Sequence, residues 1–183
     1  MLVEEEKIRQ QLVERFGLPA DKITVQRERR IWADIPAANF GEIFDYAADK
    51  LGFVILAAIT GLDEGPTLGV IYHIARESGI ILNLHISIPK DKPVIKTVSV
   101  RFPAADAYER ELVDLLGMQV EGLPAGNRYP LPDNWPAGQY PLRKDWKSDT
   151  IGKTPASPES SAKGETSPLG GQASRDGEVT ENA

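Results

Sequence analysis

The sequence contains no cysteine among its 183 residues. Thiolates hold most iron–sulfur clusters and many structural zinc ions, and they are the nucleophiles of cysteine-dependent enzymes. The absence of cysteine therefore excludes all three kinds of site, and it excludes disulfides.

A hydrophobic run long enough to cross a membrane is also lacking, since such a run takes roughly 18 consecutive apolar residues. The best candidate, residues 53–62, is about half that length and contains Thr60 and Gly61. The chain opens with acidic residues at positions 4–6, the wrong charge for a secretory signal or an organelle transit peptide. We expect any membrane association to come through partner proteins.

An excess of positive charge is also lacking: 21 Lys and Arg stand against 27 Asp and Glu, so the formal net charge is -6 and the pI is near 5.0. Nucleic-acid binding relies on clustered Lys and Arg, so a nucleic-acid partner is not expected. The one basic cluster, Arg27, Arg29 and Arg30, is interrupted by Glu28. This cluster is typical of the solvated turn of a hairpin.

Motifs of nucleotide binding and catalysis are missing as well. The glycines at 61, 65 and 69 do not fit a dinucleotide-binding loop, and neither a phosphate-binding P-loop nor a nucleophile elbow occurs. Asp63 and Glu64 fall in a predicted turn and need no catalytic explanation. We therefore predict no catalytic and no cofactor-binding residue.

Hydrophobic periodicity predicts an α/β (α+β) protein, with a mixed sheet of about four to six strands and flanking helices. The continuous apolar run 53–59 indicates a central strand that is buried on both faces. The predicted helices are 3–16, 36–51 and 104–116, and the predicted strands are 23–26, 30–35, 53–59, 68–75 and 82–88.

Strands 68–75 and 82–88 are predicted to form a hairpin that turns at 76–79 and places Tyr72 opposite Leu82. In that register His73 and His85 lie on one face about 13 Å apart, at roughly 3.3 Å per residue. This separation is too large for a shared metal ion. We predict two histidines of a sheet face and no metal site.

The composition divides the chain into three parts: an α/β domain (1–117), an extended C-terminal arm (118–146) and a tail (147–183). The arm has five prolines, which forbid long regular elements, yet it also carries aromatic residues evenly along its length. Such a segment must lie on a surface, either of its own domain or of a second protein. The tail is about half Ser, Thr, Gly and Pro, so we predict that it is disordered unless bound.

Two stretches have the composition of a docking surface. The helix 104–116 places Asp106 and Arg110 at the spacing of an ion pair, and further charges crowd what we expect to be its exposed surface. The alternative is an ordinary solvated helix face. Near the end of the arm, a basic pair at 143–144 stands beside an acid and tryptophans, which concentrate binding energy in interfaces. The alternative there is a surface turn.

These two stretches resemble the signatures of the complex I 30 kDa subunit family, known as the C subunit of bacterial NADH–quinone oxidoreductases, with relatives in membrane-bound energy-converting nickel–iron hydrogenases. The first runs Glu-Arg-Glu-Leu-Val-Asp-Leu-Leu-Gly over 109–117; the second runs Leu-Pro-Asp-Asn-Trp over 131–135 and Pro-Leu-Arg-Lys-Asp over 141–145. The resemblance covers about residues 1–146. Respiratory members usually have Glu-Gly-His-Pro and then a basic pair, whereas this chain has Leu123 in place of the His and Asn127 in place of one base. The hydrogenase branch is favoured on this ground.

The resemblance implies a non-catalytic structural subunit of a membrane-associated complex I-type oxidoreductase. It would dock on the large subunit (49 kDa or nickel–iron type), beside a small iron–sulfur subunit, peripherally on the cytoplasmic side of the membrane. Iron–sulfur clusters, and a nickel–iron centre or NADH, would then belong to the partners. The predicted partner-binding residues are Glu109, Arg110, Glu111, Asp114, Arg128, Trp135, Arg143, Lys144, Asp145 and Trp146.

Two alternatives of other classes remain. One is a freestanding binding or regulatory protein whose arm folds back on its own sheet. The other is an enzyme with a carboxylate or histidine site. The C subunit of a respiratory NADH–quinone oxidoreductase is the alternative within the family.

Overall fold

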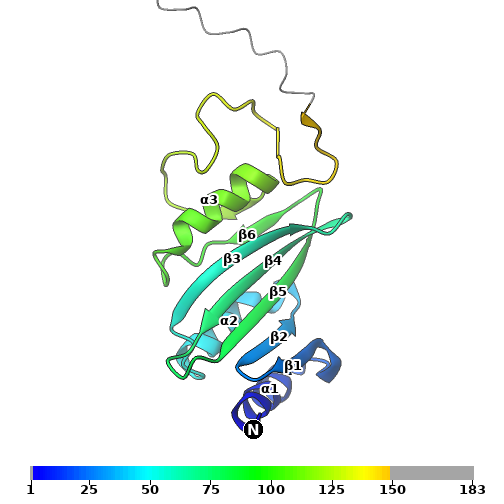
Figure 1. Ribbon diagram of the computed structural model, residues 1–183, viewed down its shortest axis with the longest axis vertical. Coiled ribbons are helices and arrows are strands. Elements are labelled where there is room, and N and C mark those ends of the chain that lie inside the picture. The colour runs from blue at the N-terminus through cyan, green and yellow to red at the C-terminus, as the bar shows by residue number, and fades with distance from the viewer. Residues whose placement is uncertain (1, 149–183) are drawn as a thin grey trace, which may run out of the picture. The chain divides into compact units, whose positions relative to one another are not determined.

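A five-stranded sheet with strand order β1-β2-β5-β4-β3 forms the centre of the protein in this computed structural model, which describes residues 2–148 (Figure 1). Strands β6 and β7 form a separate two-stranded parallel sheet, and α3 lies between them along the chain. The elements of the described residues are α1 (Val3–Phe16), η1 (Ala20–Lys22), β1 (Ile23–Arg27), β2 (Arg30–Asp34), η2 (Ala37–Asn39), α2 (Phe40–Asp49), β3 (Ile55–Asp63), β4 (Thr67–Ala75), β5 (Ile81–Pro89), β6 (Val94–Lys96), α3 (Ala105–Leu116) and β7 (Gln119–Glu121).

The sheet is mixed, as predicted, because β2 runs parallel to β5 while all its other pairs are antiparallel. The predicted hairpin of β1 and β2 is confirmed, and the charged cluster lies at its turn, where Arg29 has a φ of 60°. The predicted disorder of residues 147–183 lies outside the described residues, apart from Lys147 and Ser148. Within 2–148, no helix is long and apolar enough to cross a membrane.

The core lies between one face of the sheet and α2, which is seen behind the sheet in Figure 1. Phe40 of α2 stacks on Tyr72 of β4 with 4.3 Å between ring centroids. Leu84 of β5 faces the same core and is fully buried. At the other end of the sheet, α1 packs on β1, and the Arg9 guanidinium donates to the Ile23 carbonyl oxygen at 2.7 Å.

The prediction of a central strand at 53–59 is wrong, because β3 is an edge strand. In the described part of the chain, β4 is its one neighbouring strand, and α3 packs against β3 on one face of the sheet. A Cβ at Gly61 would collide with Cδ1 of Leu116, so the helix comes close to the strand only because this residue is glycine. Val54 and Ile55 remain about half exposed, which a strand buried on both faces would not allow.

The predicted hairpin of β4 and β5 is present, but its register is shifted by two residues. Tyr72 pairs with Leu84 rather than Leu82. The turn is longer than predicted, since the Arg76 N–H donates to the Ile80 carbonyl at 3.0 Å and Gly79 inside the loop has a φ of 82°. A two-residue shift keeps every side chain on its predicted face, because the period of a strand is two.

Both histidines lie on one face of the sheet, as predicted, and α2 covers the other face. The shifted register pairs His85 with Ile71 and His73 with Asn83, so they are two positions apart along the strands rather than four, and the predicted separation is wrong. Each histidine is held between polar partners. His85 contacts Asp34 through Nδ1 at 2.7 Å and Glu64 through Nε2 at 2.9 Å. His73 lies between the Thr60 hydroxyl at 3.0 Å and the Asn83 side-chain carbonyl at 2.6 Å. Among the described residues, no group of three His, Asp or Glu side chains is arranged to hold a metal ion.

Candidate functional site

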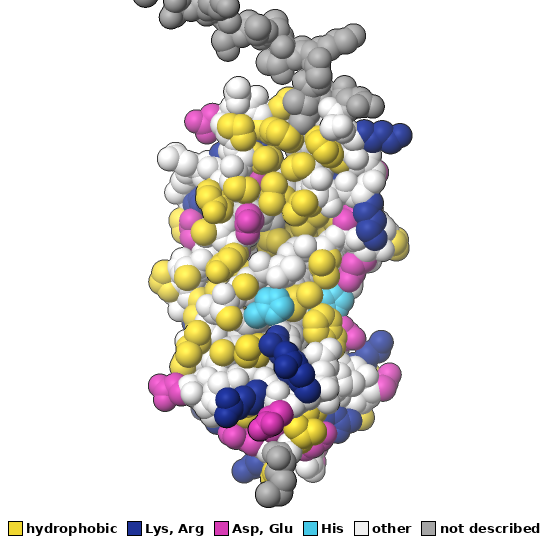
Figure 2. All heavy atoms as spheres, in the orientation of Figure 1, with side chains coloured by type: hydrophobic (Ala, Val, Ile, Leu, Met, Phe, Trp, Pro, Cys, Tyr) yellow, Lys and Arg dark blue, Asp and Glu magenta, His cyan; other side chains and the backbone are white. Residues whose placement is uncertain are grey.

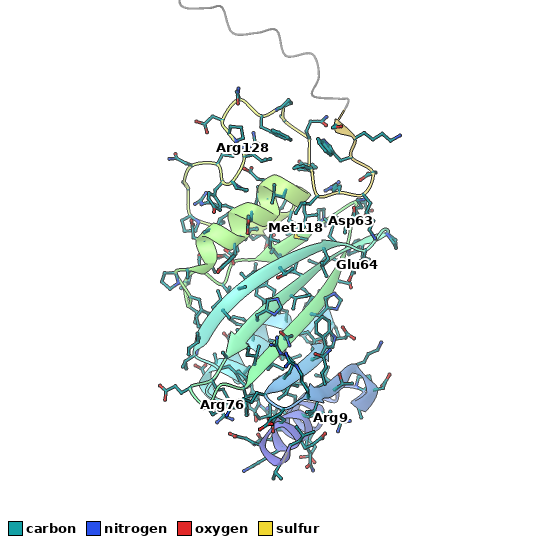
Figure 3. The ribbon with its side chains drawn as sticks, viewed as in Figure 1. Arg9, Asp63, Glu64, Arg76, Met118 and Arg128 are labelled. Atoms are coloured by element: carbon teal, nitrogen blue, oxygen red, sulfur yellow. The ribbon has the colours of Figure 1, made fainter. Side chains whose placement is uncertain are left out.

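The candidate site consists of α3 and the C-terminal arm, which folds back over the helix to the tip of the β3–β4 hairpin (Figure 3). α3 ends at Gly117, whose φ of 68° is the left-handed conformation of a helix cap. The Gly117 N–H donates to the Val113 carbonyl at 3.0 Å. The chain then turns through β7 and returns along the helix.

Glu109 is fully buried, so the prediction that its side chain lies on the exposed helix surface is wrong. Its carboxylate accepts hydrogen bonds from the Thr97 hydroxyl at 2.5 Å and from the Val98 N–H at 2.7 Å. Burial raises the pKa of Glu109, although these two hydrogen bonds lower it in part. The first acid of the signature therefore fastens the loop that precedes α3.

Arg110 forms the predicted ion pair with Asp106, with Nε 2.7 Å from the carboxylate. It also donates to the carbonyl oxygens of Pro124 at 2.7 Å and Asn127 at 3.3 Å. A Cβ at Gly126 would collide with Nη2 of this arginine, so the arm passes very close to the guanidinium. Arg110 thus fixes the first part of the arm to α3.

Asp114 and Arg128 fix the middle of the arm. Asp114 is buried, and its carboxylate accepts from Arg128 Nε at 2.9 Å and from the Leu131 N–H at 3.2 Å. Arg128 Nη1 donates in turn to the Trp135 carbonyl at 2.9 Å. The prediction that Asp114 belongs to an exposed surface is therefore wrong as well: its charge is neutralised within the chain.

The tryptophans of the arm stack on each other. The ring centroids of Trp135 and Trp146 are 6.3 Å apart, and both indole N–H groups donate to Gln139, at 2.9 and 3.0 Å. Arg143 lies over the Tyr140 ring, 4.6 Å from its centroid, and donates from Nε to the Leu116 carbonyl at 2.7 Å. The last carbonyls of α3 are therefore partly satisfied by the arm.

Sequence reasoning missed Asp63 and Lys90, which anchor the end of the arm. The Asp63 carboxylate, nearly inaccessible, contacts Lys90 Nζ at 2.7 Å and accepts from the Lys144 N–H at 2.8 Å. The hydrogen bond from Lys90 lowers the pKa of Asp63 despite the opposing effect of burial. Lys90 Nζ also lies 3.1 Å from the Asp145 carboxylate. Nothing in the local sequence of the predicted turn indicated these long-range partners.

The arm lies on its own domain, the first of the two surfaces considered for it, and most charged groups and aromatic rings of residues 104–146 have partners within the chain. Glu111 is the exception on α3: it makes no hydrogen bond or ion pair with any described residue. Hydrophobic side chains nevertheless gather on the outer surface over α3 and the arm (Figure 2). In the arm, Tyr129 and Leu142 are 50% and 54% exposed. Partner binding by the ten predicted residues stays a prediction.

A mixed sheet with a helix and a bonded, proline-rich arm, whose outer surface is apolar, is typical of an α/β protein that presents an interaction surface. The sequence matches the family of the respiratory-chain NADH dehydrogenase 30 kDa subunit over residues 33–151. The chain belongs to this family.

Relatives of the chain are subunits of several complex I-like enzymes. Membrane-bound hydrogenase subunit beta of Pyrococcus furiosus is 30% identical over 78% of this chain and 86% of that protein. The C subunit of the NADH-quinone oxidoreductase of Moorella thermoacetica is 29% identical over 64% of this chain and 80% of that protein. A chain of the membrane-bound sulfane sulfur reductase, an archaeal respiratory membrane complex, superposes with a TM-score of 0.71 at 27% identity and covers 81% of this chain and 88% of that one.

Proposed function

We propose that this chain is a non-catalytic structural subunit of a membrane-associated complex I-type oxidoreductase, and that it docks on the large subunit of the 49 kDa or nickel–iron type. The observation that carries the proposal is the unit formed by α3 and the arm: many internal bonds hold it rigid, yet its outer surface is apolar. A rigid surface loses little conformational entropy on binding, which favours a permanent interface.

The internal bonds assign a physical role to the family signature. Glu109, Arg110 and Asp114 tie α3 to the preceding loop and to the arm, and they do so in the isolated chain. In the proposed function the signature charges build the docking surface, while neighbouring apolar side chains supply the contact area. Lys144 and Asp145, which are exposed, would lie at its polar rim.

Within the family, we propose the branch of the energy-converting hydrogenases. The missing His at Leu123 and the missing base at Asn127 support it, as does the long match to a hydrogenase subunit beta. The respiratory NADH–quinone oxidoreductase branch is the alternative. Four cysteines in the neighbouring large subunit, placed to ligate nickel and iron, would decide for the hydrogenase branch.

In this proposal the chain binds no cofactor. Iron–sulfur clusters, and a nickel–iron centre or NADH, belong to the large subunit and to a small iron–sulfur subunit, and the chain helps to fix the distances between their redox centres. Its attachment to the membrane is peripheral, on the cytoplasmic side, and runs through these partners.

Purification of the tagged protein from its own cells tests the proposal. We expect it to carry with it a large oxidoreductase subunit from the solubilised membrane fraction. The double variant Arg143→Ala with Asp145→Ala should reduce this recovery, because both residues hold the arm in place. Recovery of the chain alone from every fraction would refute the proposal.

One observation favours the alternative of a freestanding binding protein: the arm is folded back on its own chain. Protection of the arm from proteases does not separate the two functions, since both predict it. The purification from membranes does, because a freestanding protein would be recovered without oxidoreductase subunits.

A further inference from the structure

The outer edge of β3 has no backbone partner among the described residues, because β3 is the last strand of its sheet and pairs only with β4. The Glu64 N–H donates to the Thr67 carbonyl at 3.0 Å. Along an antiparallel ladder, hydrogen-bonded pairs alternate with non-hydrogen-bonded pairs. Because Glu64 is in a hydrogen-bonded pair, Gly61 and Ile59 are in non-hydrogen-bonded pairs, and their N–H and C=O groups point away from β4. An extended polypeptide can pair with these groups.

An apolar groove of about 220 Å³ accompanies this edge. Ile59 and Gly61 of β3 form one wall, Leu115 of α3 forms the other, and Leu142 of the arm contributes to the lining. Next to it on β3, Leu62 is 39% exposed. The groove therefore offers a site for an aliphatic side chain beside a free strand edge.

Glu111 also lines this groove. The other signature charges on α3 are all bonded within the chain, whereas Glu111 has no partner among the described residues. A carboxylate beside an apolar groove is complementary to a cationic side chain. β3 itself contains no Lys or Arg, so the same edge of a second copy of this chain would not supply that cation.

We propose that the edge of β3 and the groove beside α3 accept an extended segment of a partner subunit. This segment adds a strand to the sheet, places an aliphatic side chain in the groove and carries a Lys or Arg opposite Glu111. The inference rests on the proposed function for the existence of the partner, and adds where and through what chemistry that partner binds.

Thiol labelling tests this placement, because the chain has no native cysteine and an introduced cysteine is its only thiol. We compare Leu62→Cys with the control Val100→Cys, whose native residue is 90% exposed on the loop before α3. In the complex purified from membranes, a maleimide should label Leu62→Cys roughly tenfold more slowly than in the isolated chain, since labelling needs an accessible thiol. Val100→Cys should react equally fast in both.

A charge reversal tests the cation. Glu111→Lys should lower recovery of the partner on the order of tenfold, because it places two cations together in the interface. Glu28→Lys, the same change at the exposed β1–β2 turn, should leave recovery unchanged. Cross-links from Leu62→Cys should map to an extended segment of the partner with a Lys or Arg.

Three results would overturn the inference. If the wild-type chain recovers its partner but Leu62→Cys is labelled equally fast in both states, the edge is uncovered and only the inference fails. Cross-links to residues 149–183 of the same chain, or to a second copy, would show a different occupant. If the wild-type chain recovers no oxidoreductase subunit, the proposed function fails and the inference fails with it.

Discussion

Gly117 joins α3 to the arm, and an alanine at this position measures how firmly the arm is seated. The residue has a φ of 68°, and a Cβ there would lie 2.5 Å from Cε2 and Cζ of Tyr140. Gly117→Ala therefore introduces two separate effects, left-handed backbone strain and a steric clash with the arm.

Gly17 separates these effects, because it caps α1 in nearly the same conformation, with a φ of 61°, and has no atom within 4 Å of its Cβ position. Alanine in the left-handed region costs about 1–2 kcal/mol, and we expect this loss for both variants. In Gly117→Ala the Tyr140 ring must also move, which adds roughly 1–3 kcal/mol, as overpacking usually does. The displaced ring also loses its contact with Arg143, which now lies 4.6 Å from the ring centroid.

Urea denaturation of the wild type and the two variants gives the free energies of unfolding, and limited trypsin digestion at Arg128 reports the release of the arm. Gly117→Ala should be the less stable variant, and it alone should be cleaved faster in the arm. Equal losses in the two variants, with an unchanged rate of cleavage, would show that the arm does not rest on Gly117.

Three further predictions concern the buried charges. The hydrogen bond from Lys90 lowers the pKa of Asp63. The stability that this carboxylate contributes is therefore present above its ordinary pKa of 3.8 and is lost as the pH falls through the lowered pKa. In urea denaturation, the free energy of unfolding of Asp63→Asn should fall less steeply with acid than that of the wild type. Glu109→Ala should lower the free energy of unfolding by about 2–4 kcal/mol, because it leaves a cavity and an unpaired buried N–H. Glu109→Gln should lower it by less than about 1 kcal/mol, since burial already favours a neutral side chain at this position. Arg128→Met should cost about 2–3 kcal/mol, because the buried Asp114 carboxylate loses its cation, and it should speed proteolysis of the arm.

Each of these predictions has an outcome that contradicts it. The ion pair of Asp63 would be unimportant if its asparagine variant kept the wild-type acid profile. If Glu109→Ala and Glu109→Gln were equally stable, the hydrogen bonds that the Glu109 carboxylate accepts would not contribute to stability. If the arm of Arg128→Met resists trypsin like the wild type, assayed at the remaining sites Arg143 and Lys144, other contacts suffice to hold it.

Local signals predicted most of the secondary structure. The three helices and the hairpins lie within a few residues of their predicted positions, because apolar periodicity and helix-ending glycines at 17 and 117 act over short distances. The order of the strands could not be read in the same way. α3 lies against Ile59 and Gly61 near the end of β3, whereas Val54 and Ile55 at its start stay about half exposed. Single-sequence periodicity cannot separate burial by a helix from burial by a neighbouring strand.

The sequence by itself determined the family, the mixed sheet and the absence of thiolate ligands, since each depends on residue identity or on spacing along the chain. Only the tertiary structure decided which charges face inward. Glu109 and Glu111 are two residues apart on one helix, yet the first is fully buried and bonded while the second has no partner among the described residues. Whether a carboxylate is bonded depends on residues distant in sequence, such as Lys90 opposite Asp63, and these meet only when the chain folds.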